Sequence, residues 1–178
     1  FAEEAMAGLA WTLVLLSAVC MIAMPWLMVL IAPGFAGNAE KYDLSVLLTQ
    51  IAFPYLICMS LVALLSGVLN SLGKFVESSS VSIVLNLTLT AAMLIAMALG
   101  YKNEPAAGIV LAWGVFAAGL LQLALLLWGV WSNDLWSTLR RPRWSEDMRR
   151  LVRLGLPGVV AGGVTQINIL IGTMIASL

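Results

Sequence analysis

Hydrophobic and polar residues follow one another along this chain in long blocks. Five stretches contain no Asp, Glu, Lys or Arg, and they cover residues 5–39, 44–73, 78–101, 105–133 and 154–178. Each exceeds the ~20 residues that a helix needs to cross the hydrocarbon core of a bilayer. Membrane β-strands alternate in polarity, and these stretches do not. The pattern predicts an all-α, polytopic bundle with five membrane-spanning helices, at about residues 8–31, 45–71, 80–99, 106–131 and from 154 onward.

Composition supports a membrane protein and excludes several kinds of chemistry. The chain is 62% hydrophobic and 10% charged, which is far from the composition of a soluble domain. It has no His, and its two cysteines, Cys20 and Cys58, lie in apolar stretches where free Cys packs as a small hydrophobe. We therefore expect no catalytic residues, no metal site, no cofactor and no nucleic-acid partner. We also expect the chain to be an internal segment of a longer protein.

Basic residues are concentrated in one loop and predict the orientation of the helices. Six of the nine lie between residues 140 and 153, and the others are Lys41, Lys74 and Lys102. Short loops rich in Lys and Arg stay in the cytoplasm. Because successive helices alternate in direction, Lys74 is also expected inside, and Lys41 and Lys102 outside. The first and the fifth helix then run from the cytoplasm outward.

The basic loop is predicted to contain a short helix of its own. Ser145 is a favourable N-cap, and the acidic residues that follow it suit the positive end of a helix dipole. Arg149, Arg150 and Arg153 fall on one face, opposite apolar side chains. This pattern is typical of an interfacial amphipathic helix, in which the arginines anchor the segment to an anionic bilayer surface.

Prolines are expected to distort the first two spans. Pro25 is predicted to kink the outer end of the first span. Pro54 removes a backbone donor inside the second span and clashes with the carbonyl of Gln50. Small and polar residues of the second span, including Ser60 and Gly67, share one face. That face either packs closely against another helix or lines a cavity.

The fifth span has the most asymmetric pattern of polar residues. One face carries small and polar residues, Gln166 flanks it, and the other side is apolar. The small and polar face consists of Gly158, Ala161, Gly162, Thr165, Asn168, Gly172 and Ala176, and Ile169 is the one large apolar residue on it. Glycines at such positions favour close helix packing. Two amides at mid-membrane depth, however, require polar partners or water. We predict that Thr165, Gln166 and Asn168 line a cavity, together with Ser60 and with Asn86 of the third span, and that Pro54, Gly67, Gly158 and Gly162 serve bending or packing.

Taken in order, several segments resemble the lipid II flippase family known as MurJ or MviN. The resemblance covers essentially the whole chain and rests on Ile31-Ala32-Pro33-Gly34-Phe35, Phe53-Pro54-Tyr55, Ser60-Leu61-Val62-Ala63, Gly67-Val68-Leu69-Asn70-Ser71, Phe75, Asn86, Leu156-Pro157, Gly163-Val164-Thr165-Gln166-Ile167-Asn168 and Ala176-Ser177. Two departures stand out. The family often has Arg at the position of Gln50, and it tends to have prolines where this chain has Ser78 and Ser82.

The resemblance implies a place within a larger fold. The chain would hold the third to seventh of fourteen helices, with residues 1–132 in the N-terminal lobe, residues 133–153 as a cytoplasmic loop and residues 154–178 opening the C-terminal lobe. The implied protein is a monomer in the bacterial inner membrane. By alternating access it would carry the undecaprenyl-pyrophosphate-linked disaccharide-pentapeptide across the bilayer. The family's essential cationic residues sit mainly in helices outside this segment.

Three other interpretations remain open from the sequence. One is a multidrug or O-antigen lipid exporter of the same superfamily. Another is a membrane-embedded enzyme acting on polyprenyl lipids, which would require a cluster of acidic or His side chains that the sequence does not provide. The last is a structural scaffold, which the mid-membrane Gln166 and Asn168 disfavour only mildly.

Overall fold

This computed structural model describes residues 2–101, 104–133 and 146–177, and helices are the only regular secondary structure in them. This confirms the predicted all-α class. In chain order the helices are α1 (Ala2–Ile22), α2 (Met24–Ile31), the short 3-10 helix η1 (Pro33–Gly37), α3 (Ala39–Ala52), α4 (Tyr55–Ser71), α5 (Phe75–Ala98), α6 (Pro105–Ser132) and α7 (Glu146–Ser177).

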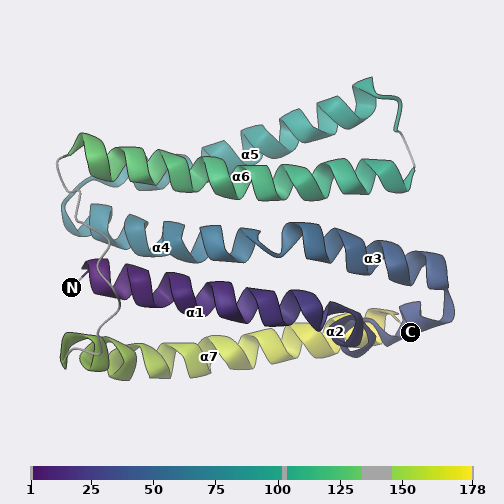
Figure 1. Ribbon diagram of the computed structural model, residues 1–178, viewed down its shortest axis with the longest axis horizontal. Coiled ribbons are helices and arrows are strands. Elements are labelled where there is room, and N and C mark those ends of the chain that lie inside the picture. The colour runs from purple at the N-terminus through teal and green to yellow at the C-terminus, as the bar shows by residue number, and fades with distance from the viewer. Residues whose placement is uncertain (1, 102–103, 134–145, 178) are drawn as a thin grey trace.

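The long helices lie side by side and alternate in direction (Figure 1). Helix α6 packs against α5, α4 and α3, and α1 packs against α4. Helix α7 lies at the opposite edge from α5 and α6, and its main contacts are with α2 and η1. The N-terminus, the α4–α5 turn, the end of α6 and the start of α7 share one end of the molecule. The chain therefore alternates between two ends, and which end faces the cytoplasm stays a prediction.

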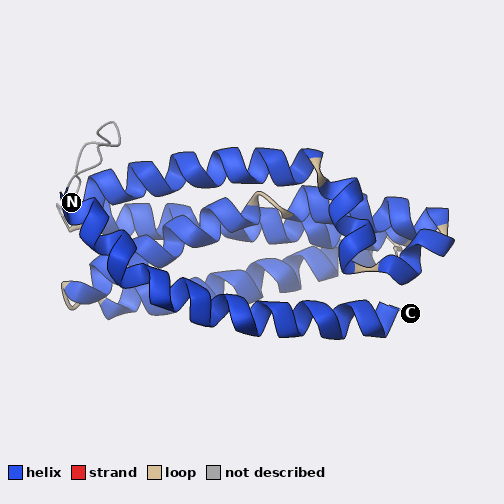
Figure 2. Ribbon diagram, turned by 90° about the horizontal axis from the view of Figure 1, so that it is seen from below, coloured by secondary structure: helices blue, strands red, loops and turns tan. Residues whose placement is uncertain are grey.

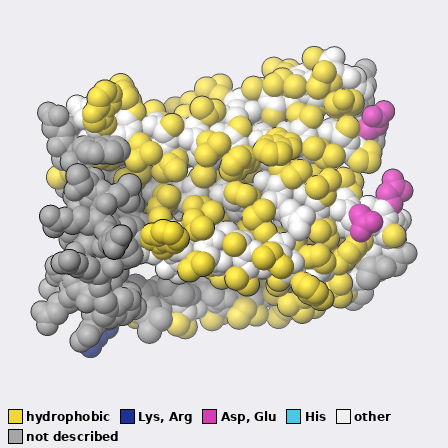
Figure 3. Space-filling view, viewed as in Figure 1, with side chains coloured by type: hydrophobic (Ala, Val, Ile, Leu, Met, Phe, Trp, Pro, Cys, Tyr) yellow, Lys and Arg dark blue, Asp and Glu magenta, His cyan; other side chains and the backbone are white. Residues whose placement is uncertain are grey.

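The surface between these two ends is apolar. In Figure 3, acidic side chains gather at one end, a basic side chain marks the other, and hydrophobic side chains cover the face between them. Trp11, Leu15 and Val19 of α1 are each more than 60% exposed. Such a surface is stable in lipid rather than in water.

The lengths of the apolar helices support four of the five predicted spans. Three qualify singly, namely Ala39–Ser71, Phe75–Ala98 and Pro105–Ser132, and α1 with α2 forms a fourth if the bent pair is one span. The described apolar part of α7, Gly162–Ile175, is shorter than a span. The fifth span therefore stays a prediction.

Both predicted proline distortions are present, and they differ in size. At Pro25 the axes of α1 and α2 diverge by 75°, so that α2 turns away from α1 (Figure 2). At Pro54 the helix is interrupted only by a turn at Phe53 and Pro54, and α3 with α4 still forms one rod of 33 residues. The first distortion is a sharp elbow and the second is a local break.

The hydrophobic core lies where α4, α5 and α6 meet. It consists of Val62, Leu65, Leu69, Val81, Leu126 and Val130. Helix α4 thus buries its larger apolar side chains, while Ala63, Gly67 and Ser71 of the small and polar face remain exposed. The face of the second span that carries Ser60 is therefore not the face that packs in this chain.

The segment between residues 146 and 177 differs from the prediction. A short interfacial helix followed by a separate span was expected, but α7 runs without interruption from Glu146 to Ser177. Arg149 and Arg150 lie in its first turns, and the side chain of Arg153 is exposed. The predicted N-cap, Ser145, lies outside the described residues. A helix continues past the edge of an apolar stretch because polar residues with good helix propensity, such as Arg and Glu, can extend it into water.

Candidate functional site

The three cavity candidates of α7 are exposed in this chain. Thr165, Gln166 and Asn168 all have exposed side chains, and so do the neighbouring apolar residues Val164 and Ile167. Among the described residues, α7 contacts the other helices mainly through α2 and η1, and the described middle of α7 is largely exposed. Two exposed amides in a surface as apolar as this one require a polar neighbour or water.

The other two candidates lie apart from the α7 residues. Ser60 of α4 is half-buried, and Asn86 of α5 is exposed. Nδ2 of Asn86 donates to the Ser82 carbonyl of its own helix at 2.9 Å. Asn86 is thus exposed in this chain and bonds within its own helix, and its predicted role in lining a cavity stays a prediction. Because α5 and α7 lie at opposite edges of the molecule (Figure 1), the five candidates do not form one site here.

The glycines predicted to pack closely have no close neighbours among the described residues. A Cβ atom added at Gly67, Gly158 or Gly162 would meet nothing within 4 Å. The packing role therefore stays a prediction that concerns helices outside this chain.

Close helix contacts occur instead at glycines of α6. A Cβ added at Gly114 would lie 2.6 Å from Cβ of Ala92, and one at Gly119 would lie 2.7 Å from Cδ2 of Tyr55. These glycines are structural, because they let α5 and α4 approach the α6 backbone.

A buried side-chain amide connects two helices in the closely packed part of the bundle. Gln122 of α6 is 1% exposed, and its Nε2 donates to the Val81 carbonyl of α5 at 2.9 Å. Its Oε1 has no hydrogen-bond partner among the described atoms. The Gln122 amide therefore connects α6 with α5 and does not face the α7 surface.

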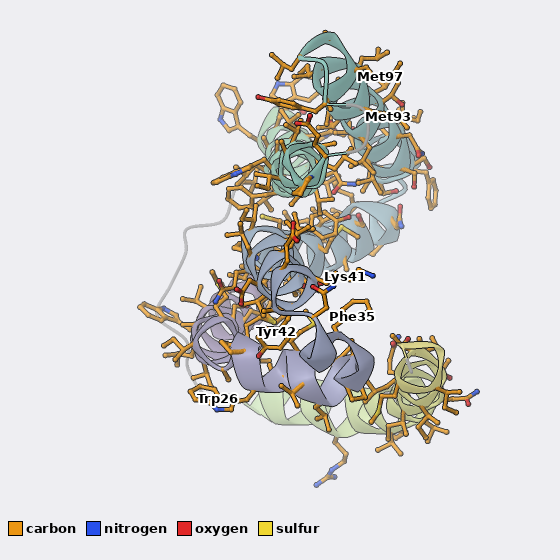
Figure 4. All side chains as sticks on the ribbon, turned by 90° about the vertical axis from the view of Figure 1, so that its right-hand side faces the viewer. Trp26, Phe35, Lys41, Tyr42, Met93 and Met97 are labelled. Carbon is orange, nitrogen blue, oxygen red and sulfur yellow. The ribbon has the colours of Figure 1, made fainter. Side chains whose placement is uncertain are left out.

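A second amide acts at the elbow between α1 and α2. Nε2 of Gln50 on α3 donates to the Met21 carbonyl at 3.0 Å, and the Tyr42 hydroxyl donates to the Pro25 carbonyl. Figure 4 shows Tyr42 against α2, with Trp26 pointing away from the helices. Sequence reasoning missed this pair. The available signal was Pro25, which leaves the carbonyl four residues earlier without its helical donor.

The described residues offer little reactive chemistry. They contain no group of three or more His, Cys, Asp or Glu side chains that could hold a metal ion. The polar groups of the apolar zone are amides and hydroxyls, which can form hydrogen bonds to a polar ligand and position it.

The antiparallel helices, the apolar surface and the polar stripe on α7 define a polytopic α-helical membrane protein. The family profile described as "Lipid II flippase MurJ" matches residues 1–178. The chain belongs to this family.

Three relatives show how far the similarity extends. Proteins named "Probable lipid II flippase MurJ" from Rhizobium tropici and Rhizobium meliloti (strain 1021) are 44% and 42% identical to the chain, over 99% of its length. The protein of that name from Rickettsia prowazekii (strain Madrid E) is 33% identical, again over 99%. The chain covers 33%, 33% and 34% of these relatives, so it spans about a third of their length.

Proposed function

We propose that this chain is part of a flippase that moves a lipid-linked peptidoglycan precursor across the bacterial inner membrane. The observation that carries the proposal is the match to the family along the whole chain, with relatives named for lipid II. The transported lipid would be the undecaprenyl-pyrophosphate-linked disaccharide-pentapeptide. A monomer would suffice, with residues 1–132 in one lobe and residues 154–178 opening the other.

The polar stripe of α7 is the part of this chain best suited to contact the cargo. Thr165, Gln166 and Asn168 carry hydrogen-bonding groups at membrane depth and are exposed. Leaving such groups against hydrocarbon is costly, so a water-filled cavity is the favourable environment for them. The sugars and the pyrophosphate of the precursor are rich in hydrogen-bonding groups. They would cross beside this stripe while the polyprenyl tail stays in the bilayer.

The arrangement of the helices suits alternating access. Helix α7 meets the preceding helices mainly at its contact with α2 and η1, whereas α3 to α6 pack together along their lengths. Alternating access requires two bodies that rock about a limited contact. In this proposal Arg149, Arg150 and Arg153 rest on the cytoplasmic surface of the membrane and hold the start of α7 there.

The test uses the complete protein in cells depleted of their own flippase. We expect Gln166→Leu and Asn168→Leu to reduce the rescue of growth, because each removes hydrogen-bonding groups from the cavity. Ile167→Leu is the control, because Ile167 is exposed on the side of α7 opposite Thr165 and carries no side-chain hydrogen-bonding group. Full rescue by both leucine variants at normal expression would contradict the cavity role.

A further inference from the structure

The elbow between α1 and α2 exposes a backbone acceptor that its own helix cannot use. Pro25 has no N–H, so the Met21 carbonyl cannot accept the usual hydrogen bond from the residue four positions later. In apolar surroundings an unpaired carbonyl is costly, and membrane helices tolerate proline only where a neighbour supplies a donor. The 75° bend occurs at this point.

Helix α3 supplies that donor and a second bond beyond the proline. Gln50 bonds to the Met21 carbonyl at 3.0 Å, before the bend, and Tyr42 bonds to the Pro25 carbonyl, after the bend has begun. Both side chains are half-buried. Because α3 continues into α4 and packs on α6, the two bonds connect the elbow to the rigid part of the bundle.

The elbow is also where α7 meets the earlier helices. Helix α2 and the following η1 provide the main contacts of α7 among the described elements. Met24 and Met28 of α2 are buried, so one face of this short helix packs inward. The direction of α2 therefore sets the position of the surface on which α7 rests.

We infer that Gln50 and Tyr42 are positioning residues that hold the α1–α2 elbow bent, and that the bent elbow sets the position of α7 relative to α1. Gln50 acts through the carbonyl that Pro25 frees. The inference does not depend on what the protein transports, because it concerns only the geometry of the chain.

The test measures distances between spin labels in the complete protein, freed of its native cysteines. One pair of labels replaces Leu15 on α1 and Leu30 on α2, both exposed. Each label lies seven or eight residues from the bend, so straightening the 75° elbow would lengthen the Leu15–Leu30 distance by ~5 Å at a rise of 1.5 Å per residue. We expect Gln50→Met and Tyr42→Phe to add a population at longer distance.

Gln122→Met is the matched control for Gln50→Met. It removes a hydrogen bond of similar length from a side-chain amide to a helix carbonyl, but that carbonyl lies in α5, far from the elbow. We expect it to leave the Leu15–Leu30 distances unchanged. Tyr42→Phe removes a single oxygen atom, so the inference remains testable if the Gln50 variant folds poorly.

A double-mutant cycle tests whether Gln50 acts through Pro25. Pro25→Ala restores the N–H that can bond to the Met21 carbonyl, and we expect it to shift the Leu15–Leu30 pair toward the straight geometry. In that background Gln50→Met should add little further change, because the carbonyl already has a donor.

A second pair of labels, at Leu15 and Val164, reports the position of α7. We expect its distances to broaden in Gln50→Met and to stay narrow in Gln122→Met. Unchanged elbow distances in both Gln50→Met and Tyr42→Phe would overturn the inference, and so would an equal shift in the Gln122 control. A shifted elbow with an unmoved α7 would overturn the second half of the inference, whatever the cargo proves to be.

Discussion

Helices α6 and α7 are both rich in glycine and carry amides, yet they use these residues differently. In α6, Gly114 and Gly119 touch neighbouring helices, and Gln122 is buried and bonded to α5. In α7, Gly158 and Gly162 have nothing within 4 Å among the described residues, and Gln166 and Asn168 are exposed. Small and polar residues in a membrane helix therefore do not by themselves show whether their face packs closely within this chain or stays open for a cavity or for other helices.

The largest difference between the two helices is expected when a glycine of each is replaced by alanine and the free energy of unfolding is compared. Gly114→Ala puts a methyl group 2.6 Å from Cβ of Ala92 and should lower the free energy of unfolding by about 1–3 kcal/mol. Gly162→Ala meets nothing in this chain and should cost less than Gly114→Ala, because only helices outside this chain could oppose the new methyl group and Ala has the higher helix propensity. Thermal unfolding of the complete protein in detergent measures both.

A compensating change serves as the control for the Gly114 variant. Ala92→Gly removes the methyl group that the new side chain meets, so the double variant should recover part of the lost stability. Equal destabilisation by Gly114→Ala and Gly162→Ala would contradict the difference between α6 and α7, because it would show that another helix packs on Gly162 in the complete protein.

A smaller effect is expected from removing the amides. Gln122→Leu breaks one interhelical hydrogen bond, which should cost about 0.6 kcal/mol, the average for such bonds in a membrane protein. Gln166→Leu should leave the free energy of unfolding unchanged while it lowers transport. Chemical denaturation compares the two proteins directly. A loss of stability in the Gln166 variant as large as that in the Gln122 variant would assign Gln166 to packing instead.

The sequence predicts the long helices and both proline distortions because these depend on local composition. Where a helix begins is less predictable. Helix α5 was expected from about residue 80 and begins at Phe75, and α7 was expected from about residue 154 and begins at Glu146. In α7 the extension runs through Glu, Asp and Arg residues, where hydrophobicity gives no signal, whereas in α5 it adds Phe75 and Val76 before Glu77.

The buried face of a membrane helix is harder to predict than its existence. Helix α4 buries Val62, Leu65 and Leu69 and leaves its small and polar face open. In lipid, apolar and small side chains can both pack against a neighbour, so polarity alone does not choose between the two faces. The bond from Gln50 to Met21 joins positions 29 residues apart, and it depends on the register of two helices that no local pattern encodes.

Accessibility to an aqueous reagent tests the central claim about α7 most directly. Single cysteines at Thr165 and Asn168, on the stripe, and at Val164 and Ile171, on the apolar face, can be placed in the complete protein without its native cysteines. We predict that a water-soluble maleimide labels the two stripe positions in membrane vesicles and leaves the two apolar positions unlabelled. Absence of labelling at both stripe positions, with the reagent present on both sides of the membrane, would contradict a water-filled cavity along α7.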